Sequence, residues 1–366
     1  MLLRDRLTVG HRPLKPRIIV RVYVPQPSSK LTINMNILVD LTIVFICLFF
    51  LIKGSEWVMK GSVALAQRFH ISKLVIASTL IALGTGLPTI AVNIFLVIMG
   101  KNGMDVAVGN ALGTNFVNIG LGLGIPAFML TIIPKYQVFE KEIPIYLAIT
   151  ALLTSFAFDG VITRVEGIII MLAYVITLII IYQYSLREQL REVDNKEVDV
   201  DTSTISETIT NNLSIKKSLL YLFMGFVVLI VFAIALVSMT GRLSQDFNIS
   251  EYILGLTIIG IGTSVPMIVT SIKSAKKGYV DIIVGNVFGS TIANIALGIG
   301  LTAIFVPLLF NKEAISDIYT FNILNILVIF GLLIEMKLLG KSKSFNWVSG
   351  LVIVAFYVIY LLTKIF

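Results

Sequence analysis

The stretch IALGTGLPTIAVN, residues 81–93, interrupts a long apolar run with two glycines, two threonines and a proline. Pro88 has no backbone N–H, and its ring clashes with the carbonyl of Gly84, four residues earlier. In hydrocarbon such a released carbonyl costs several kcal/mol, so it is tolerated only inside protein or beside a polar cavity. We therefore expect Pro88 to break a membrane helix at a place where the chain needs polar groups.

Apolar runs fill almost the whole chain on both sides of this stretch. The 366 residues are 57% hydrophobic and 14% charged, with a mean hydropathy of +0.94, whereas soluble proteins carry about a quarter charged residues. A helix of roughly 17–25 apolar residues crosses a bilayer. Such runs occur at 37–66, 73–99, 105–133, 142–158, 163–183, 217–239, 251–274, 281–308, 318–336 and 346–364. The sequence therefore predicts an all-α, multi-pass integral membrane protein with ten transmembrane helices.

Basic residues are distributed unevenly along the chain. Residues 1–34 hold seven Lys or Arg and a single acid, Asp5, so most of the net charge of +8 belongs to this tail. We expect the tail to be disordered or absent from the mature protein, with a cleaved targeting segment as the alternative. No nucleic-acid-binding motif accompanies the charge, and we expect no nucleic-acid partner.

The loops give the expected orientation. The Lys and Arg residues outside the tail gather in the loops on one side of the ten helices, at 67–73, 134–141, 184–216, 274–280 and 337–345. The positive-inside rule makes these loops cytoplasmic. It places the polar linker 184–216 inside and both ends of the ten-helix core outside, in what we expect to be a prokaryotic plasma membrane. The single cysteine, Cys47, excludes an intramolecular disulfide.

The sequence repeats itself after about 178 residues. ISKLVIASTLIALGTGLPT (71–89) aligns with ISEYILGLTIIGIGTSVPM (249–267), and DVAVGNALGTNFVNIGLGLG (105–124) aligns with DIIVGNVFGSTIANIALGIG (281–300). The matched stretches divide the core into two five-helix halves, 35–183 and 217–366. Because five is odd, the second half enters the membrane in the opposite direction, so the sequence predicts an inverted repeat.

An inverted repeat with a Gly/Pro interruption at the same place in each half indicates the midplane binding site of a secondary transporter. Close packing alone explains glycine pairs such as Gly109 and Gly113, but it does not require matched hydroxyl and amide residues. The predicted cation-binding side chains are Thr85, Thr89, Asn110, Thr114, Asn118, Thr263, Ser264, Asn286, Ser290 and Asn294. Pro88 and Pro266 are the predicted helix breakers, and the carbonyls of Gly84 and Gly262 are the predicted backbone ligands.

These two motif pairs resemble the alpha repeats of the calcium/cation antiporter superfamily, which includes the sodium/calcium exchangers. The general form is G-T-S-x-P-E followed by G-N-x-x-G-S-N-x-x-N or -D. The resemblance implies a ten-helix exchanger fold with cation sites made by helices 2, 3, 7 and 8, across which helices 1 and 6 slide to alternate access. The motif glutamate is absent from both repeats, where Thr89 and Met267 stand in its place, and Gly86 replaces the first motif serine.

The missing glutamates change the expected substrate. Calcium takes six to eight oxygens, usually including several carboxylates, whereas the predicted site offers hydroxyls, amides and carbonyls without formal charge. We expect a secondary antiporter coupled to Na⁺, with Ca²⁺ as the counter-ion that the resemblance implies. The alternatives are a monovalent Na⁺/H⁺ or K⁺ exchanger, a channel-like cation pathway or a transport-inactive relative.

The sequence also bears on whether the protein is an enzyme and on which partners it has. No His, Asp, Glu or Cys cluster with catalytic or metal spacing lies at helical depth, which argues against an enzyme. We expect no cofactor, and we expect the lipid bilayer and inorganic cations as partners. The oligomeric state stays open.

The acids within the core have structural interpretations. We expect Glu56 to pair with Lys53 or Lys60, Glu166 to pair with Arg164, and Asp105 and Asp281 to stabilise helix N-termini.

Overall fold

The computed structural model describes residues 30–68, 82–98, 103–132, 142–195, 213–247, 249–278, 280–338 and 347–365. The predicted tail lies mostly outside these residues, as does 196–212 of the predicted linker. Within the described part, eight helices are long and apolar enough to cross a membrane, and two shorter apolar helices cover Leu83–Val97 and Ile143–Asp159. Each of these ten segments overlaps one of the predicted runs, so the all-α membrane fold is confirmed.

The elements follow one another in two comparable series. The first half contains α1 (Lys30–Arg68), α3 (Ala82–Ile98), α4 (Met104–Val117), η3 (Asn118–Leu123), α5 (Gly124–Met129), α6 (Ile143–Phe156), η5 (Ala157–Asp159), β1 (Val161–Ile162) and α7 (Arg164–Asn195). The second contains α9 (Ile215–Phe247), α10 (Glu251–Leu254), η6 (Gly255–Ile259), α11 (Gly260–Lys276), α12 (Val280–Ala293), η7 (Asn294–Gly300), α13 (Leu301–Phe305), β2 (Leu308–Leu309), α14 (Lys312–Leu338) and α15 (Trp347–Ile365). Helix α7 runs on to Asn195, so the first part of the predicted linker is helical.

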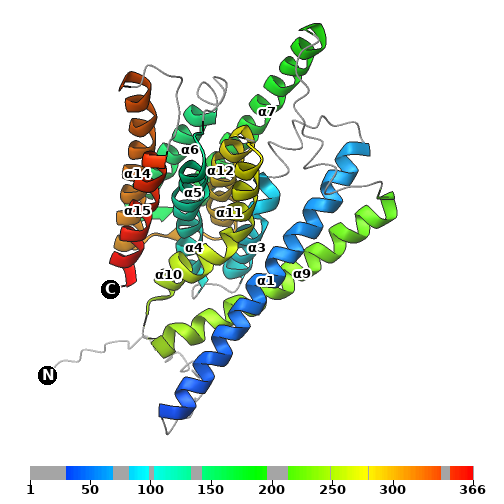
Figure 1. Ribbon diagram of the computed structural model, residues 1–366. Coiled ribbons are helices and arrows are strands. Elements are labelled where there is room, and N and C mark those ends of the chain that lie inside the picture. Colours follow the sequence, from blue (N-terminus) through cyan, green and yellow to red (C-terminus); the bar gives the residue numbers. More distant parts are fainter. Residues whose placement is uncertain are drawn as a thin grey trace, which may run out of the picture.

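Helices α1 and α9 form a tilted pair at one side of the molecule, while α14 and α15 lie at the opposite side (Figure 1). Two glycines lie where this pair is in contact: a Cβ on Gly54 would be 3.1 Å from the carbonyl oxygen of Gly225, and one on Gly225 would be 2.8 Å from that of Gly54. Without side chains at these two positions the backbones approach closely, as is common between membrane helices. The pair also contacts α3 and α11, which carry the two motif prolines.

The centre of the protein is built from α3, α4, α11 and α12 with the π-helical segments η3, η6 and η7. Gly109 and Gly113 of α4 lie against the backbone carbonyls of Tyr252 and Leu256, where any side chain would clash. On the facing segment, a Cβ on Gly255 would be 2.5 Å from the carbonyl oxygen of Val106. The close packing predicted for the first glycine pair is confirmed, and it brings a motif helix of each half together.

The predicted helix breaks at the prolines are wrong. Helices α3 and α11 continue through Pro88 and Pro266, although each proline still cannot donate a hydrogen bond to the carbonyl four residues earlier. The irregular backbone lies elsewhere, in three π-helical segments within the described residues. Two of them begin at Asn118 and at Asn294, and the third covers residues 255–259, directly before α11. A π-helical turn inserts an extra residue without ending the helix and often occurs at a functional site.

A two-stranded antiparallel ribbon joins the two halves away from the centre. Strand β1 pairs with β2 through Val161 opposite Leu309 and Ile162 opposite Leu308. Gly160 turns the chain into β1 with a φ of 86°, a backbone conformation that favours glycine.

Candidate functional site

Buried hydroxyl and amide side chains gather where the two halves meet. We call this group the polar centre; its members are at most 4% exposed. They are Thr85, Thr89 and Asn93 of α3, Asn110 and Thr114 of α4, Asn118 of η3, Thr263, Ser264 and Ser271 of α11, Asn286, Ser290 and Thr291 of α12, and Asn294 of η7. All ten predicted cation-binding side chains lie in it.

The motif threonines bond crosswise between the halves. Thr263 Oγ1 donates to Asn110 Oδ1 over 3.2 Å and lies 3.3 Å from Thr114 Oγ1. In the mirrored arrangement, Thr85 Oγ1 donates to Asn286 Oδ1 over 3.0 Å and lies 2.9 Å from the hydroxyl of Ser290. Each half thus supplies a threonine to the amide and hydroxyl of the other, so the centre forms only when the two halves come together.

The four motif amides divide into two kinds. Asn110 and Asn286 are engaged at both ends, since each also donates from Nδ2: to Asn93 over 2.7 Å and to Ser271 over 3.5 Å. Among the described residues, Asn118 Oδ1 and both polar atoms of Asn294 are buried without a hydrogen-bond partner. A buried acceptor left without a partner costs roughly 1–3 kcal/mol, and such oxygens suit a cation.

The glycine at position 86 makes room for one of these amides. A Cβ on Gly86 would be 3.1 Å from Asn294 Oδ1, closer than an ordinary contact. The second half has Ser264 at the matching position, and its hydroxyl donates to the carbonyl of Gly260 over 2.6 Å. The departure from the motif serine at Gly86 therefore opens space beside an oxygen that has no partner.

Thr89 and Met267, at the two glutamate positions of the motif, behave differently. Thr89 Oγ1 lies 3.3 Å from Thr114 Oγ1 and joins the row of hydroxyls. Met267 is buried against Gly122, and its sulfur accepts a hydrogen bond from Ser271 over 3.6 Å. One position thus supplies an oxygen, and the other supplies a weak sulfur acceptor.

Formal charge is absent from the hydrogen bonds that build the polar centre. None of those described involves Asp or Glu, and no group of three or more His, Cys, Asp or Glu that could hold a metal ion occurs within the described residues. The carboxylate of Glu142 does border α12: its oxygens are 3.8 Å from where a Cβ on Gly285 would lie, one residue before Asn286.

The predicted roles of the other acids hold in part. Glu56 pairs with Lys53 over 2.9 Å, as predicted. The predicted pair of Glu166 with Arg164 is wrong, because Glu166 accepts from the backbone N–H of Thr163 over 2.7 Å at the start of α7, and Arg164 donates to the carbonyl of Phe305. Asp105 lies in the first turn of α4; the side chain of Asp281 lies outside the described residues.

Sequence reasoning missed several members of the polar centre. Asn93 closes the stretch 81–93, and Ser271 stands at the matching place in the other half, four residues after Met267. That agreement in spacing was the available signal. It was weak, because the paired residues differ in type and lie beyond the aligned stretches 71–89 and 249–267.

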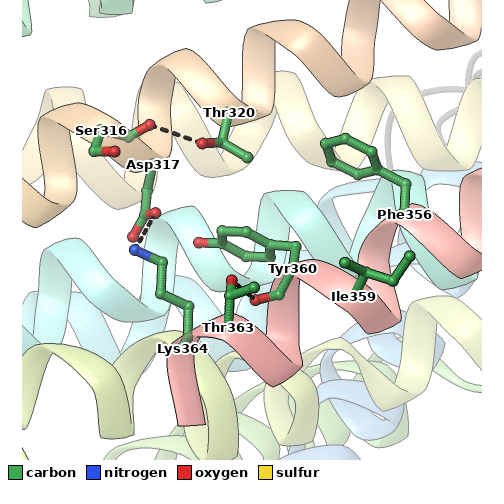
Figure 2. A pocket seen from close by; sticks show the side chains of 8 residues that line it. All are labelled: Ser316, Asp317, Thr320, Phe356, Ile359, Tyr360, Thr363 and Lys364. Carbon is green, nitrogen blue, oxygen red and sulfur yellow. Dashed lines mark hydrogen bonds and ion pairs between the residues drawn. The ribbon is translucent and has the colours of Figure 1, made fainter. Parts of the chain in front are cut away.

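A cavity of about 340 Å³ lies apart from the polar centre, between α14 and α15 (Figure 2). Asp317, which is fully buried, reaches the ammonium of Lys364 over 2.6 Å and accepts from the hydroxyl of Tyr252 over 2.6 Å. The ammonium also lies 5.7 Å from the centre of the Tyr360 ring. The cavity lining is Ser316, Asp317, Thr320, Phe356, Ile359, Tyr360, Thr363 and Lys364, so no residue of the polar centre contributes.

Comparisons with known proteins agree on one family. The family model described as sodium/calcium exchanger protein matches residues 40–183 and 217–366. The chain is 31% identical to inner membrane protein YrbG of Escherichia coli K12, over 74% of this chain and 80% of that protein. It is 26% identical to sodium/calcium exchanger MaX1 of Methanosarcina acetivorans, over 89% of this chain and 98% of that protein.

A solved structure shows the same architecture. The sodium-calcium exchanger NCX_Mj, soaked with 2.5 mM Na⁺ and 10 mM Sr²⁺, superposes with a TM-score of 0.59 at 25% identity. The match covers 89% of this chain and 99% of that one. Both halves of the chain and the centre between them fall within these matched regions.

Proposed function

Because this chain belongs to the sodium/calcium exchanger protein family, we propose that it is a secondary antiporter that binds its cation at the polar centre. The observation that carries the proposal is the crosswise arrangement of Thr85 with Asn286 and Thr263 with Asn110, beside the unpartnered oxygens of Asn118 and Asn294. Buried oxygens contributed by both halves of an inverted repeat are typical of a transporter's midplane site.

The proposed substrate is a monovalent cation, with Na⁺ on at least one side of the exchange. A bare divalent ion loses a large hydration energy on entering the protein, and carboxylates normally compensate for it. The polar centre supplies hydroxyl and amide oxygens, while Thr89 and Met267 hold the positions of the motif glutamates. Neutral oxygens compensate more readily for the smaller hydration loss of Na⁺ or K⁺. Ca²⁺, which is part of the names of several relatives, is therefore the weaker candidate for this chain.

The proposed mechanism is alternating access by movement of α1 and α9 across the centre. Two features support it: the pair lies to one side of the other helices (Figure 1), and glycines let the two backbones approach closely, beside apolar side-chain contacts such as Phe50 stacked on Phe232. It also contacts α3 and α11, which carry Thr85 and Thr263. A shift of the pair would expose the centre first to one side of the membrane and then to the other.

The proposed orientation places both ends of the ten-helix core outside and the segment 184–216 in the cytoplasm. The support is the bias of Lys and Arg toward one set of loops.

Ion flux in proteoliposomes tests the proposal. The purified full chain is reconstituted, and Na⁺, K⁺, Ca²⁺ and H⁺ gradients are imposed singly and in pairs. We expect saturable Na⁺ efflux that requires a counter-ion on the opposite side. Flux without a counter-ion would instead indicate a channel-like pathway, and no flux with any ion pair would indicate a transport-inactive relative.

A further inference from the structure

A row of hydrogen bonds runs from a backbone carbonyl to the hydroxyls of the polar centre. Asn93 Nδ2 donates to the carbonyl of Gly298 over 3.0 Å, Asn93 Oδ1 accepts from Asn110 Nδ2 over 2.7 Å, and Asn110 Oδ1 accepts from Thr263. We infer that Asn93 is a positioning residue of the ion site, acting through Asn110 on the hydroxyls of Thr263 and Thr114. The inference rests on the proposed cation binding at this centre.

The carbonyl of Gly298 decides how the two amides are turned. A carbonyl only accepts hydrogen bonds, so Asn93 must direct its Nδ2 toward Gly298 and its Oδ1 toward Asn110. That oxygen also only accepts, so Asn110 must present Nδ2 to Asn93 and Oδ1 to Thr263. An asparagine without such an anchor can exchange its two ends by a half-turn of the amide.

The orientation of Asn110 decides whether it accepts from the Thr263 hydroxyl or donates to it. Besides Thr114, Thr263 faces three acceptors, Asn110 Oδ1 and the carbonyls of Ile259 and Gly260, the last two 2.9 Å and 3.4 Å away, so it gives its proton to one of them. It must then accept from Thr114, and Thr114 from Thr89, each over 3.3 Å. This ordering keeps the remaining lone pairs available, and a cation binds lone pairs. A turned Asn110 would donate from Nδ2 to Thr263 and occupy a lone pair instead.

The absence of a side chain at Gly298 leaves room for Asn93 to make this bond. Asn93 is fully buried, and a Cβ on Gly298 would lie 3.2 Å from Asn93 Nδ2, tighter than an ordinary contact. The bond also joins α3 of the first half to η7 of the second, the segment that begins with Asn294. Asn93 thus links the two halves at the place where an unpartnered amide enters the centre.

The second half contains a weaker version of the same arrangement. Ser271 takes the place of Asn93, accepting from Asn286 Nδ2 over 3.5 Å and donating to the sulfur of Met267 over 3.6 Å. Both bonds are long, and a thioether is a poor acceptor. Removing the Ser271 hydroxyl should therefore disturb the ion site less than removing the Asn93 amide, so Ser271→Ala serves as a graded comparison within the same centre.

The test is the Na⁺ dependence of thermal stability, measured on the purified full chain in detergent. Asn93→Leu keeps the size of the side chain but removes both hydrogen bonds. We expect the Na⁺ concentration that gives half-maximal stabilisation to rise at least about tenfold, since buried polar partners are left unsatisfied. For Ser271→Ala we expect a smaller rise, of about threefold, because the lost hydrogen bonds are long and a typical single hydrogen bond contributes little net stability.

A purely structural role would lower the melting temperature equally with and without Na⁺ and leave the half-maximal concentration unchanged. That result for Asn93→Leu would overturn the inference. If this variant does not fold, Gly298→Ala supplies the same test, because its added methyl displaces Asn93 Nδ2 without removing a polar group. A wild-type chain that Na⁺, K⁺ and Ca²⁺ all fail to stabilise would instead overturn the proposed function, and the inference with it.

Discussion

The polar centre and the contact between α14 and α15 both place polar side chains inside the protein, but the kinds of interaction that hold these side chains differ. The centre uses hydroxyls and amides from four helices, and its described hydrogen bonds involve no charged side chain. The α14–α15 contact instead contains an ion pair between the buried Asp317 and the partly exposed Lys364, and adds the hydroxyl of Tyr252. A carboxylate is therefore tolerated inside this protein, and the lack of charged partners among the described hydrogen bonds of the centre is a feature of the proposed ion site.

The difference suggests separate tasks. An ion pair that is already satisfied holds helices together and leaves nothing for a passing ion. The centre leaves oxygens of Asn118 and Asn294 without partners, at a cost in stability that a bound ion would offset. Substitutions in the centre should therefore change transport more than stability, and substitutions at the ion pair should do the reverse.

The largest effect on transport is expected at the two unpartnered amides. Asn118→Ala and Asn294→Ala each remove an oxygen from the proposed ion shell, so we expect either to abolish flux in proteoliposomes. Expression should be retained and the melting temperature without ions should fall only modestly, because the lost oxygens have no hydrogen-bond partner and, of the lost nitrogens, only that of Asn118 has one, the hydroxyl of Thr291. Unchanged flux in both variants would place the ion site elsewhere.

The largest effect on stability is expected at Asp317. Asp317→Ala leaves the Lys364 ammonium without its carboxylate; breaking a fully buried pair costs about 3–5 kcal/mol, and the partial exposure of Lys364 lowers that cost. We expect a clear fall in the melting temperature of the purified protein. The double substitution Asp317→Asn with Lys364→Met should recover much of the loss, because neither charge remains buried alone. If the double variant is as unstable as Asp317→Ala, the pair is not what stabilises this contact.

The smallest effect is expected at Glu142, the acid that borders α12 beside Asn286. If the centre is neutral, Glu142→Gln should leave the preference among Na⁺, K⁺ and Ca²⁺ unchanged in competition flux assays. Only a small change in apparent affinity is expected, because Glu142 borders α12 at Gly285 and is not one of the hydroxyl and amide groups that form the polar centre. A reversal of ion preference would show that a carboxylate serves the site, and the contrast between the two regions would fail.

Much of this architecture could be predicted from the sequence, because hydropathy and repetition are strong signals in membrane proteins. The apolar runs predicted the positions of the helices, and the matched motifs identified ten side chains that the fold brings together. The breaks expected at Pro88 and Pro266 did not occur, since the helices take up their irregularity in π-helical turns instead. Local sequence does not reveal where such an extra residue is inserted.

The residues that were missed depend on contacts between distant segments. Asp317 and Lys364 lie on different helices, and neither sequence neighbourhood marks them as partners. Asn93 depends on the carbonyl of Gly298, more than two hundred residues away, which carries no side-chain signal. Sequence reasoning identifies side chains that resemble a site, whereas the backbone groups that orient them emerge only from the fold.

The central claim, that the ion site is neutral and therefore prefers monovalent cations, is tested most directly by Ca²⁺ uptake driven by a Na⁺ gradient. The unsubstituted chain is compared with the double variant Thr89→Glu, Met267→Glu, and with Thr89→Gln, Met267→Gln as the uncharged control. A unit charge pair at ~4 Å is worth about 4 kcal/mol at an effective dielectric constant of ~20, before desolvation reduces it. We predict little or no Ca²⁺ uptake by the unsubstituted chain and the Gln control, and measurable uptake by the Glu variant. Saturable, Na⁺-driven Ca²⁺ uptake by the unsubstituted chain would contradict the account.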